Sequence, residues 1–129
     1  MLERAAENLA FMERLSSIGV SLALDDFGTG YSSLSCLTTF PFDKIKIDKS
    51  FMGSLLARYE SSAIISSVVT LARGLDMSVT AEGVETVQQL DGLKTLGVNF
   101  AQGYLLGRPV TAIELEKQPL VFRPRRDAA

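Results

Sequence analysis

The order of strand-like and helix-like segments constrains the fold of this chain more than any other feature. Apolar or strictly alternating patterns predict strands at 20–27, 44–48, 77–84 and 98–105. Periodic apolar residues and capping signals predict helices over 3–18, from Ser32 or Ser33 to about Thr38, and over 59–73, 86–96 and 113–117. Alternating strands and helices with short connections form parallel strands joined by right-handed crossovers. We therefore expect an α/β fold with about four parallel strands.

The composition is that of one globular unit. The 129 residues are 47% hydrophobic and 22% charged, which provides enough apolar material for a core. A net charge of −2 offers no broad basic face, so we expect no nucleic-acid polymer as a partner. The chain contains no histidine, so acid–base chemistry falls to carboxylates, lysine, tyrosine or cysteine.

Cysteine content and hydropathy bear on the location of the protein. Cys36 is the single cysteine and cannot form an internal disulfide, which is typical of a reducing compartment. The acidic start of the chain does not match a secretory signal. The most apolar stretch, 63–72, is too short to span a bilayer. We expect a cytoplasmic protein without membrane insertion.

Polar residues gather at the carboxyl ends of the four predicted strands. They are Asp25 and Asp26, Lys46 and Asp48, Glu82, and Gln102. Parallel strands are covered on both faces, so polar side chains within them need a reason. In open sheets and barrels alike, ligands bind at this edge. We therefore expect one polar group from each strand–helix unit to converge on a common rim.

The adjacent carboxylates of Asp25 and Asp26 can offer oxygens to one or two hard cations such as Mg²⁺ or Mn²⁺. The turn Gly28-Thr29-Gly30 that follows brings backbone amides close to anything bound there. The structural alternative is that both acids simply end a strand and favour a turn.

The remaining rim residues also have a structural alternative each. Lys46 is suited to hold a phosphate oxygen or a metal-bound water, or else is a solvated lysine. Glu82 could be an acid at a helix N-terminus, although Glu85 fits that position better. Gln102 could satisfy a buried backbone group. Jointly, these residues describe the rim of a metal-assisted hydrolase.

Four sequence blocks resemble the EAL-domain cyclic-di-GMP phosphodiesterases. They are the run from Asp25 to Leu34, Lys46-Ile47-Asp48, Ala81-Glu82-Gly83-Val84-Glu85, and Gln102-Gly103-Tyr104. The resemblance extends from Ala6 to about Val110 and implies the last half of a TIM-type (β/α)₈ barrel. The family uses two divalent metals to hydrolyse cyclic-di-GMP to linear pGpG. We therefore expect a single partial EAL domain over 1–129, with a leading helix at 1–19, four βα units at 20–110, and a short helix and frayed tail at 111–129.

The resemblance also implies a role for each rim residue. Asp25 matches the carboxylate shared by both metals, and Asp26 matches a ligand of the second metal. Lys46 matches the lysine that contacts the attacking water. Glu82 matches a general base or second-metal ligand, and Gln102 matches a residue that orders that water. Glu85 and the loop residues Gly28, Thr29 and Gly30 match elements that shape the site and its dimer contacts.

The sequence departs from the family pattern in its metal ligands. The Glu-x-Leu motif of the first strand is absent, as are the Asn and the Glu that provide further ligands. The resemblance therefore implies an incomplete two-metal site for Mg²⁺ or Mn²⁺ and impaired catalysis by this chain alone. An alternative function is a non-catalytic EAL-derived module that binds nucleotide or protein partners.

A half-barrel also leaves strand edges and an apolar face uncovered. We expect self-association to cover them, with two copies meeting through an isologous interface. A longer parent protein would carry sensory or diguanylate-cyclase (GGDEF) domains.

Overall fold

The computed structural model describes residues 2–28 and 34–118 and contains one parallel sheet. The four strands are β1 (Ala23–Phe27), β2 (Lys44–Ile47), β3 (Ser78–Ala81) and β4 (Phe100–Ala101). Their spatial order is the chain order, β1-β2-β3-β4, and each neighbouring pair is parallel. This topology confirms the predicted α/β fold of four parallel strands and is that of a partial barrel.

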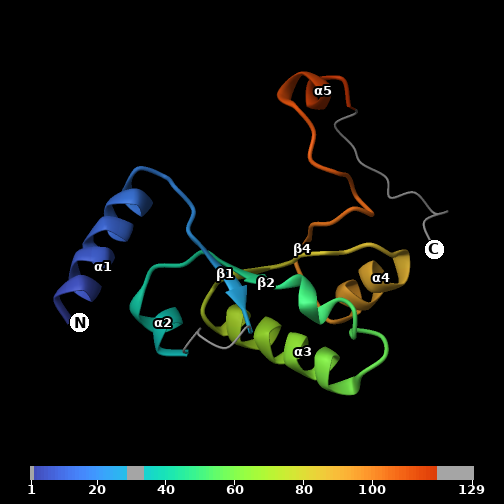
Figure 1. Ribbon diagram of the computed structural model, residues 1–129. Helices are drawn as coiled ribbons and strands as arrows, with labels where there is room; N and C mark the ends of the chain where they lie inside the picture. The colour runs from blue at the N-terminus through green and yellow to red at the C-terminus, as the bar shows by residue number, and fades with distance from the viewer. Residues whose placement is uncertain (1, 29–33, 119–129) are drawn as a thin grey trace.

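Helices precede, separate and follow the strands (Figure 1). They are α1 (Leu2–Ser17), α2 (Leu34–Thr39), α3 (Tyr59–Gly74), α4 (Val87–Thr95) and α5 (Ala112–Glu116). Each lies within two residues of its predicted bounds, where those bounds fall in the described ranges. A short 3₁₀ helix, η1 (Lys49–Phe51), was not predicted; Asp48 caps it by accepting a hydrogen bond from Ser50 N–H at 2.8 Å.

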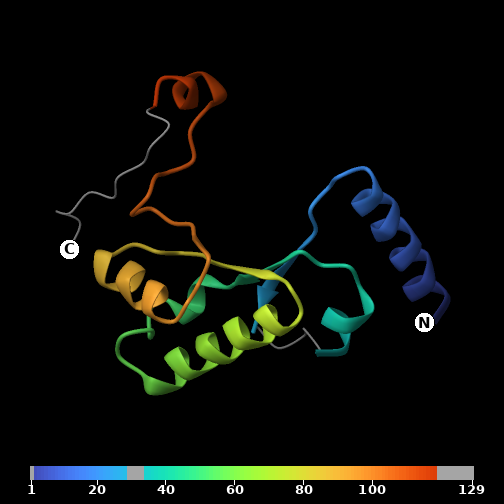
Figure 2. The same ribbon diagram turned by 180° about the vertical axis from the view of Figure 1, so that it is seen from behind.

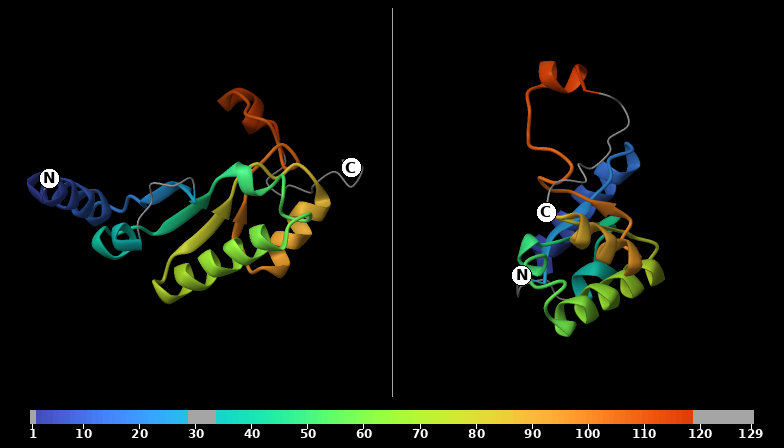
Figure 3. Two further views of the ribbon diagram at one scale, coloured as in Figure 1. Left: turned by 60° about the horizontal axis from the view of Figure 1, so that its bottom comes forward. Right: turned by 90° about the vertical axis from the view of Figure 1, so that its right-hand side faces the viewer.

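The hydrophobic core lies between the sheet and α3. The side chains of Ile45, Ile47, Val79 and Ala81 are at most 1% exposed and alternate along their strands with more polar residues. Helix α3 contributes buried Ile65 to the same cluster and runs along the sheet (Figure 3). One face of the sheet is therefore covered over its two central strands, β2 and β3.

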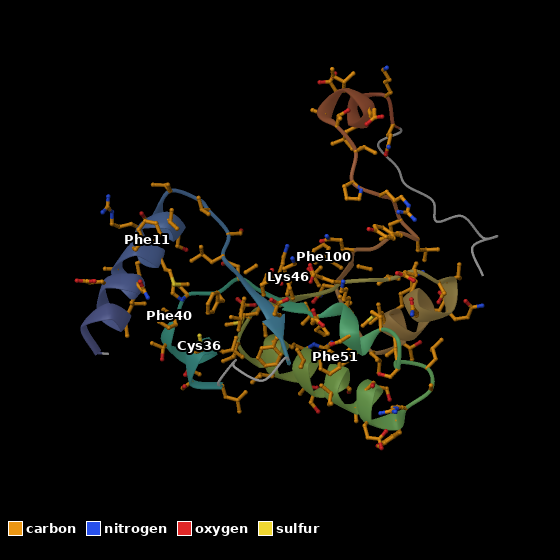
Figure 4. The ribbon with its side chains drawn as sticks, viewed as in Figure 1. Phe11, Cys36, Phe40, Lys46, Phe51 and Phe100 are labelled. Atoms are coloured by element: carbon orange, nitrogen blue, oxygen red, sulfur yellow. The ribbon has the colours of Figure 1, made fainter. Side chains whose placement is uncertain are left out.

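The opposite face of the sheet carries polar and aromatic side chains. Lys46 pairs in register with Thr80, and Thr80 pairs with Phe100. Figure 4 shows Lys46 and Phe100 on the side of the sheet away from α3, with Phe51 on the α3 side. The ammonium of Lys44 lies 5.1 Å from the centre of the Phe100 ring. In a closed barrel this face would line the interior, and further strands would pair at the edges formed by β1 and β4.

The two terminal helices stand away from the sheet. Figures 1 and 2 show α1 beyond one end of the sheet and α5 apart from the other elements. Apolar side chains on both helices are exposed, among them Phe11 at 60% and Ile113 at 67%. Within the described ranges, no helix combines the length and hydropathy needed to cross a lipid bilayer.

All four strands are shorter than predicted: β2 ends at Ile47 rather than at Asp48, and β3 spans Ser78–Ala81 rather than 77–84. Strand β1 begins at Ala23 rather than at Val20, and β4 ends at Ala101 rather than at Leu105. Beyond β4 the backbone turns back to the segment that follows β3: Val84 N–H donates to Gln102 O at 3.1 Å, and Leu105 N–H donates to Val84 O at 3.1 Å. The pattern at 98–105 is apolar because it packs in this turn as well as in the strand.

Candidate functional site

The Asp25-Asp26 pair forms a bulge in the first strand. Leu24 pairs with Ile45 and Phe27 pairs with Ile47, so two aspartates face a single residue of β2. Asp26 has a φ of 53°, in the left-handed region, where Asp is more tolerated than most residues. Its N–H donates to Asp25 Oδ1 at 2.9 Å. A bulge re-aims side chains, and this one brings both carboxylates to the carboxyl end of the sheet.

Lys46 forms a close ion pair with Glu82 across two strands. The Lys46 Nζ lies 2.5 Å from Glu82 Oε1 and 3.7 Å from Asp25 Oδ1. Glu82 follows β3 and extends the ladder, since its N–H donates to Ile47 O at 3.1 Å. The hydrogen bond to Glu82, opposed by partial burial, raises the pKa of Lys46 above its ordinary value. The lysine therefore stays protonated and offers positive charge to the carboxylates.

The predicted acidic residues come together at this point. One oxygen each from Asp25, Asp26 and Glu82 lies within 4.8 Å of the others. The aspartates are exposed and Glu82 is half-buried, so the group is open to solvent on one side. Clustered carboxylate oxygens are the donors that Mg²⁺, Mn²⁺ and Ca²⁺ prefer, so the residues fit a divalent cation.

A hollow of about 270 Å³ adjoins the carboxylates. It is lined by Lys49, Glu82, Gly83, Glu85, Gln102, Gly103 and Tyr104. Glu82 belongs to both the carboxylate group and the hollow, so a molecule in the hollow would contact the candidate metal site.

The structure places the other predicted rim residues around this hollow. Gln102 follows β4 directly, and its N–H donates to Ala81 O at 2.8 Å. Glu85 lies just before α4, where its N–H donates to Gln89 Oε1 at 2.9 Å. The helix cap itself is Thr86, whose hydroxyl accepts from Gln89 N–H at 3.1 Å. Glu85 therefore directly precedes the N-terminus of α4, the position at which the sequence suggested an acid.

Gly28 passes directly over an aromatic ring. It has a φ of +100°, and a Cβ at this position would lie 2.6 Å from the Phe51 ring. The turn after β1 therefore requires glycine for both conformation and space. Thr29 and Gly30, predicted to belong to the same loop, lie outside the described residues.

Sequence reasoning missed an aromatic–cationic pair beside the hollow. The guanidinium carbon of Arg108 lies 4.2 Å from the centre of the Tyr104 ring. The two residues are four apart in a segment that is not helical, so no periodic pattern indicated the contact. Lys49 and Gly83 were also not singled out; they meet because η1 runs beneath the turn after β3, with Gly83 at a φ of +74°.

Comparisons with known proteins agree with this geometry. The EAL domain family model matches residues 1–109. Cyclic di-GMP phosphodiesterase RocR of Pseudomonas aeruginosa is 46% identical over 110 residues, which are 85% of this chain and 28% of RocR. MucR of the same organism, a bifunctional diguanylate cyclase/cyclic di-GMP phosphodiesterase, is 46% identical over 111 residues, 86% of this chain and 16% of MucR.

Solved structures match equally well. The MucR phosphodiesterase in complex with c-di-GMP superimposes with a TM-score of 0.79 and 46% identity, over 86% of this chain and 45% of that one. A manganese and cyclic-di-GMP complex of Klebsiella pneumoniae BlrP1 gives a TM-score of 0.72 at 41% identity, over 78% of this chain and 26% of that one. BlrP1 also matches in a calcium and cyclic-di-GMP complex. This chain thus spans less than half the length of these relatives. It belongs to the EAL-domain family.

Proposed function

We propose that this chain, as one partial EAL domain over 1–129, supplies the carboxyl-terminal half of a cyclic-di-GMP phosphodiesterase. The observation that carries the proposal is the group of three carboxylates within 4.8 Å, with the Lys46 ammonium against Glu82. RocR and MucR, which are named as cyclic di-GMP phosphodiesterases, support the choice of substrate.

The cations proposed for this site are Mg²⁺ or Mn²⁺, held by Asp25, Asp26 and Glu82. Their all-oxygen donor set supports a hard divalent ion, and BlrP1 matches in its manganese complex. When bound, such ions polarise a phosphodiester and lower the pKa of a bound water.

The residues of this chain would divide the remaining work. Lys46 presents a fixed positive charge between Glu82 and Asp25, suited to a water or a phosphate oxygen. Glu82 Oε1 is the proposed acceptor of a proton from the attacking water, because it lies beside both the lysine and the hollow. Gln102 and Glu85 line the hollow and would orient the bound molecule.

The active barrel would require more than this chain. The matched regions cover 45% of the MucR structure, and the sheet here has four strands with an open polar face. We therefore propose that the chain alone has impaired activity. We also propose a cytoplasmic setting beside regulatory domains, for which MucR, a bifunctional protein, is the supporting relative.

Self-association is a separate proposal that rests on the sheet edges. Among the described residues, β1 pairs only with β2, and β4 pairs only with β3. Large apolar side chains are exposed near both edges, including Ile18 at 75% and Phe100 at 55%. Sedimentation velocity across a hundredfold range of concentration is expected to show a monomer–dimer equilibrium, and a cooperative monomer at every concentration would refute it.

Cyclic-di-GMP hydrolysis and Mn²⁺ binding by the purified chain together test the proposed function. Glu82→Gln and Asp26→Asn are the test variants, and Glu116→Gln, on α5, is the matched control. Mn²⁺ binding that both test variants weaken by at least tenfold supports the metal site. Turnover by the wild-type chain that is lost in Glu82→Gln would show that the residues of this chain suffice for hydrolysis. Mn²⁺ binding without turnover supports a half-site that needs completion. Absence of both in the wild-type chain overturns the proposal and leaves the non-catalytic binding module.

A further inference from the structure

A second hollow lies at the opposite end of the sheet from the carboxylates. It has a volume of about 280 Å³ and is enclosed by the ends of α3 and α4 and the starts of β3 and β4. Ser78, which opens β3, is four residues before Glu82, a distance of about 13 Å along a strand. This amino-end pocket is therefore separate from the candidate metal site. Its polar lining residues are Arg73, Asp76, Ser78 and Asn99.

The amino-end pocket presents one cation and one anion that do not pair. Arg73 and Asp76 both line it and are exposed. Within 2–28 and 34–118, no ion pair or side-chain hydrogen bond involves either residue. Arg73 presents N–H donors in a planar fork, and the carboxylate of Asp76 only accepts. The pair therefore suits a ligand that accepts hydrogen bonds on one edge and donates them on another.

The backbone holds both charged residues at the mouth of the pocket. Asp76 has a φ of 59°, and the turn it forms lets Met77 N–H donate to Ala72 O at 2.8 Å. The guanidinium of Arg73 packs on Gly97, where a Cβ would lie 3.3 Å from Arg73 Nη2. Gly97 has a φ of +83°, so glycine suits this turn and leaves space for the guanidinium.

Asn99 adds a neutral donor of fixed orientation. Its Oδ1 accepts from Val79 N–H at 2.8 Å, and its own N–H donates to Val79 O at 3.2 Å. The side-chain oxygen is thus used within the sheet. Among the described residues, its Nδ2 group has no acceptor, so it is left for a ligand.

The helix ends favour a neutral ligand group over a phosphate. Helix α3 ends at Gly74 and α4 at Thr95, so the carbonyl ends of both helices adjoin the pocket. Their partial negative charge disfavours an anion, and the charges of Arg73 and Asp76 offset each other. A neutral planar group with its own donors and acceptors fits these conditions, and Val69 and Met77 provide apolar contact for its faces.

Guanine has the hydrogen-bonding pattern that this pocket complements. Its O6 and N7 are adjacent acceptors that match an arginine fork, and its N1–H and N2–H donors match a carboxylate. Adenine has a donor where guanine has O6, so it cannot accept both bonds from an arginine. The volume of about 280 Å³ lies just below the usual range of about 300–1,000 Å³ for a whole small-molecule site, which suits one base.

We propose that the amino-end pocket is a second, non-catalytic site that binds a guanine base. Arg73 donates to O6 and N7, and Asp76 accepts from N1–H and N2–H. The inference goes beyond the proposed function and uses it only for the source of the ligand, since cyclic-di-GMP and its linear product both carry guanine. The lining residues all lie between Val69 and Asn99, so the pocket does not require the missing part of the barrel.

NMR titration of the isotope-labelled full chain with GMP tests the pocket. EDTA is present throughout, so that no divalent ion holds the phosphate at the carboxylates. GMP is expected to shift the amides of Ser78, Gly97 and Asn99 in a saturable manner, and AMP is expected to leave them unchanged. Parallel titration with c-di-GMP shows whether the mononucleotide or the cyclic dinucleotide saturates the same amides at the lower concentration.

Two variants test the assigned contacts. Asp76→Asn tolerates the positive φ and should weaken GMP binding about 5- to 150-fold, the range for one bidentate contact with a base. Arg73→Lys keeps the charge but loses the fork, so it should fall in the same range. Arg58→Gln, which removes an exposed arginine at the other end of α3, is the matched control and should bind GMP as the wild type does.

Inosine monophosphate tests the contact with Asp76 atom by atom, because its base lacks the N2 amino group. It should bind the wild type less tightly than GMP does, and Asp76→Asn should weaken its binding less than that of GMP. Equal weakening of the two nucleotides by Asp76→Asn would contradict the assigned contact.

The outcomes separate this inference from the proposed function. Unchanged amides at the pocket, equal shifts with AMP, or equal GMP binding by Asp76→Asn and the wild type would overturn the guanine site. None of these results bears on Mn²⁺ binding or hydrolysis at the carboxylates. A chain that binds GMP at the pocket but shows neither Mn²⁺ binding nor turnover would overturn the proposed function and leave this site standing.

Discussion

The Lys46 ammonium lies 2.5 Å from Glu82 Oε1, although the two residues belong to different strand–helix units. Their side chains are 23% and 21% exposed, so water screens the interaction only in part. The lysine faces a group of three carboxylates whose mutual repulsion it offsets. This relationship makes the stability of the sheet edge depend on a cation, whether from the protein or from solution.

Lys46→Met is therefore expected to destabilise the chain when divalent metal is removed. Loss of the ammonium should lower the free energy of unfolding by about 1–2 kcal/mol in EDTA, somewhat less than a buried hydrogen bond to a charged group because water partly screens the pair. Added Mn²⁺ should restore most of the loss by neutralising the same carboxylates. Urea denaturation with and without metal measures both effects.

The control for this variant is Lys44→Met, on the same face of the same strand. The Lys44 ammonium lies over the Phe100 ring, and no ion pair joins it to a carboxylate among the described residues. Its replacement should cost less than about 1 kcal/mol and respond little to Mn²⁺. Equal metal responses of the two variants would contradict the assignment of Lys46 to the carboxylates.

Thr80 presents a buried hydroxyl at the centre of the open face. The residue is 7% exposed, and its Oγ1 has no hydrogen-bond partner among the described residues. Thr80→Val keeps the shape and removes the unpaired oxygen, so the free energy of unfolding should stay level or rise by up to about 1 kcal/mol. Thr80→Ser keeps the hydroxyl and loses a methyl group, so it should lose about 1 kcal/mol. A loss of more than 1 kcal/mol in Thr80→Val would show that the hydroxyl has a partner in solution.

The Asp48 cap predicts a local dependence on pH. Hydrogen bonds from the Ser50 hydroxyl and N–H lower the pKa of Asp48 below its ordinary value of 3.8. The carboxylate therefore stabilises η1 at pH above the unfolded pKa, and this contribution disappears as the pH falls through the lower folded pKa. NMR titration of the Ser50 amide should give a midpoint below 3.8. Asp48→Asn should keep the cap and abolish that titration, and a midpoint at or above 3.8 would contradict the cap.

The sequence predicted the order of the elements because the periodicity is local. Helix α3, predicted at 59–73, ends only one residue later than predicted. The prediction was accurate because the apolar side chains of this helix lie on one side, where they pack against the sheet. The bulge at Asp25-Asp26 escaped prediction because it depends on Asp26 adopting a positive φ, which only the pairing with β2 reveals. Glycine turns and apolar runs indicate where a strand can lie. The length of the strand depends on how many of its residues pair with a neighbouring strand.

The candidate site, like the fold, was predicted from the sequence only in part. Polar residues at strand ends predicted the meeting of Asp25, Lys46 and Glu82, because parallel strands place their carboxyl ends together. The stacking of Arg108 on Tyr104 was not predictable, because it forms in an irregular segment whose path depends on contacts with the turn after β3. Loops that carry specificity lack the periodic pattern of apolar residues by which helices and strands are predicted.

Gly103 fixes the path of that irregular segment, and its replacement tests how tightly. Its φ is not in the left-handed region, so the effect of Gly103→Ala reports space alone. The added Cβ would meet the Val84 backbone at 2.2–2.7 Å, too close to be relieved by a side-chain rotation. We expect a loss of more than about 2 kcal/mol in the free energy of unfolding, together with weaker c-di-GMP binding, because Tyr104 moves with the backbone.

Gly53→Ala is the matched control, since nothing lies within 4 Å of a Cβ there, and its unfolding free energy should change by less than about 0.5 kcal/mol. Chemical denaturation and calorimetric titration of both variants measure the difference; a Gly103→Ala protein as stable as Gly53→Ala would show that the segment can shift without cost and that Tyr104 is not held in place by Val84.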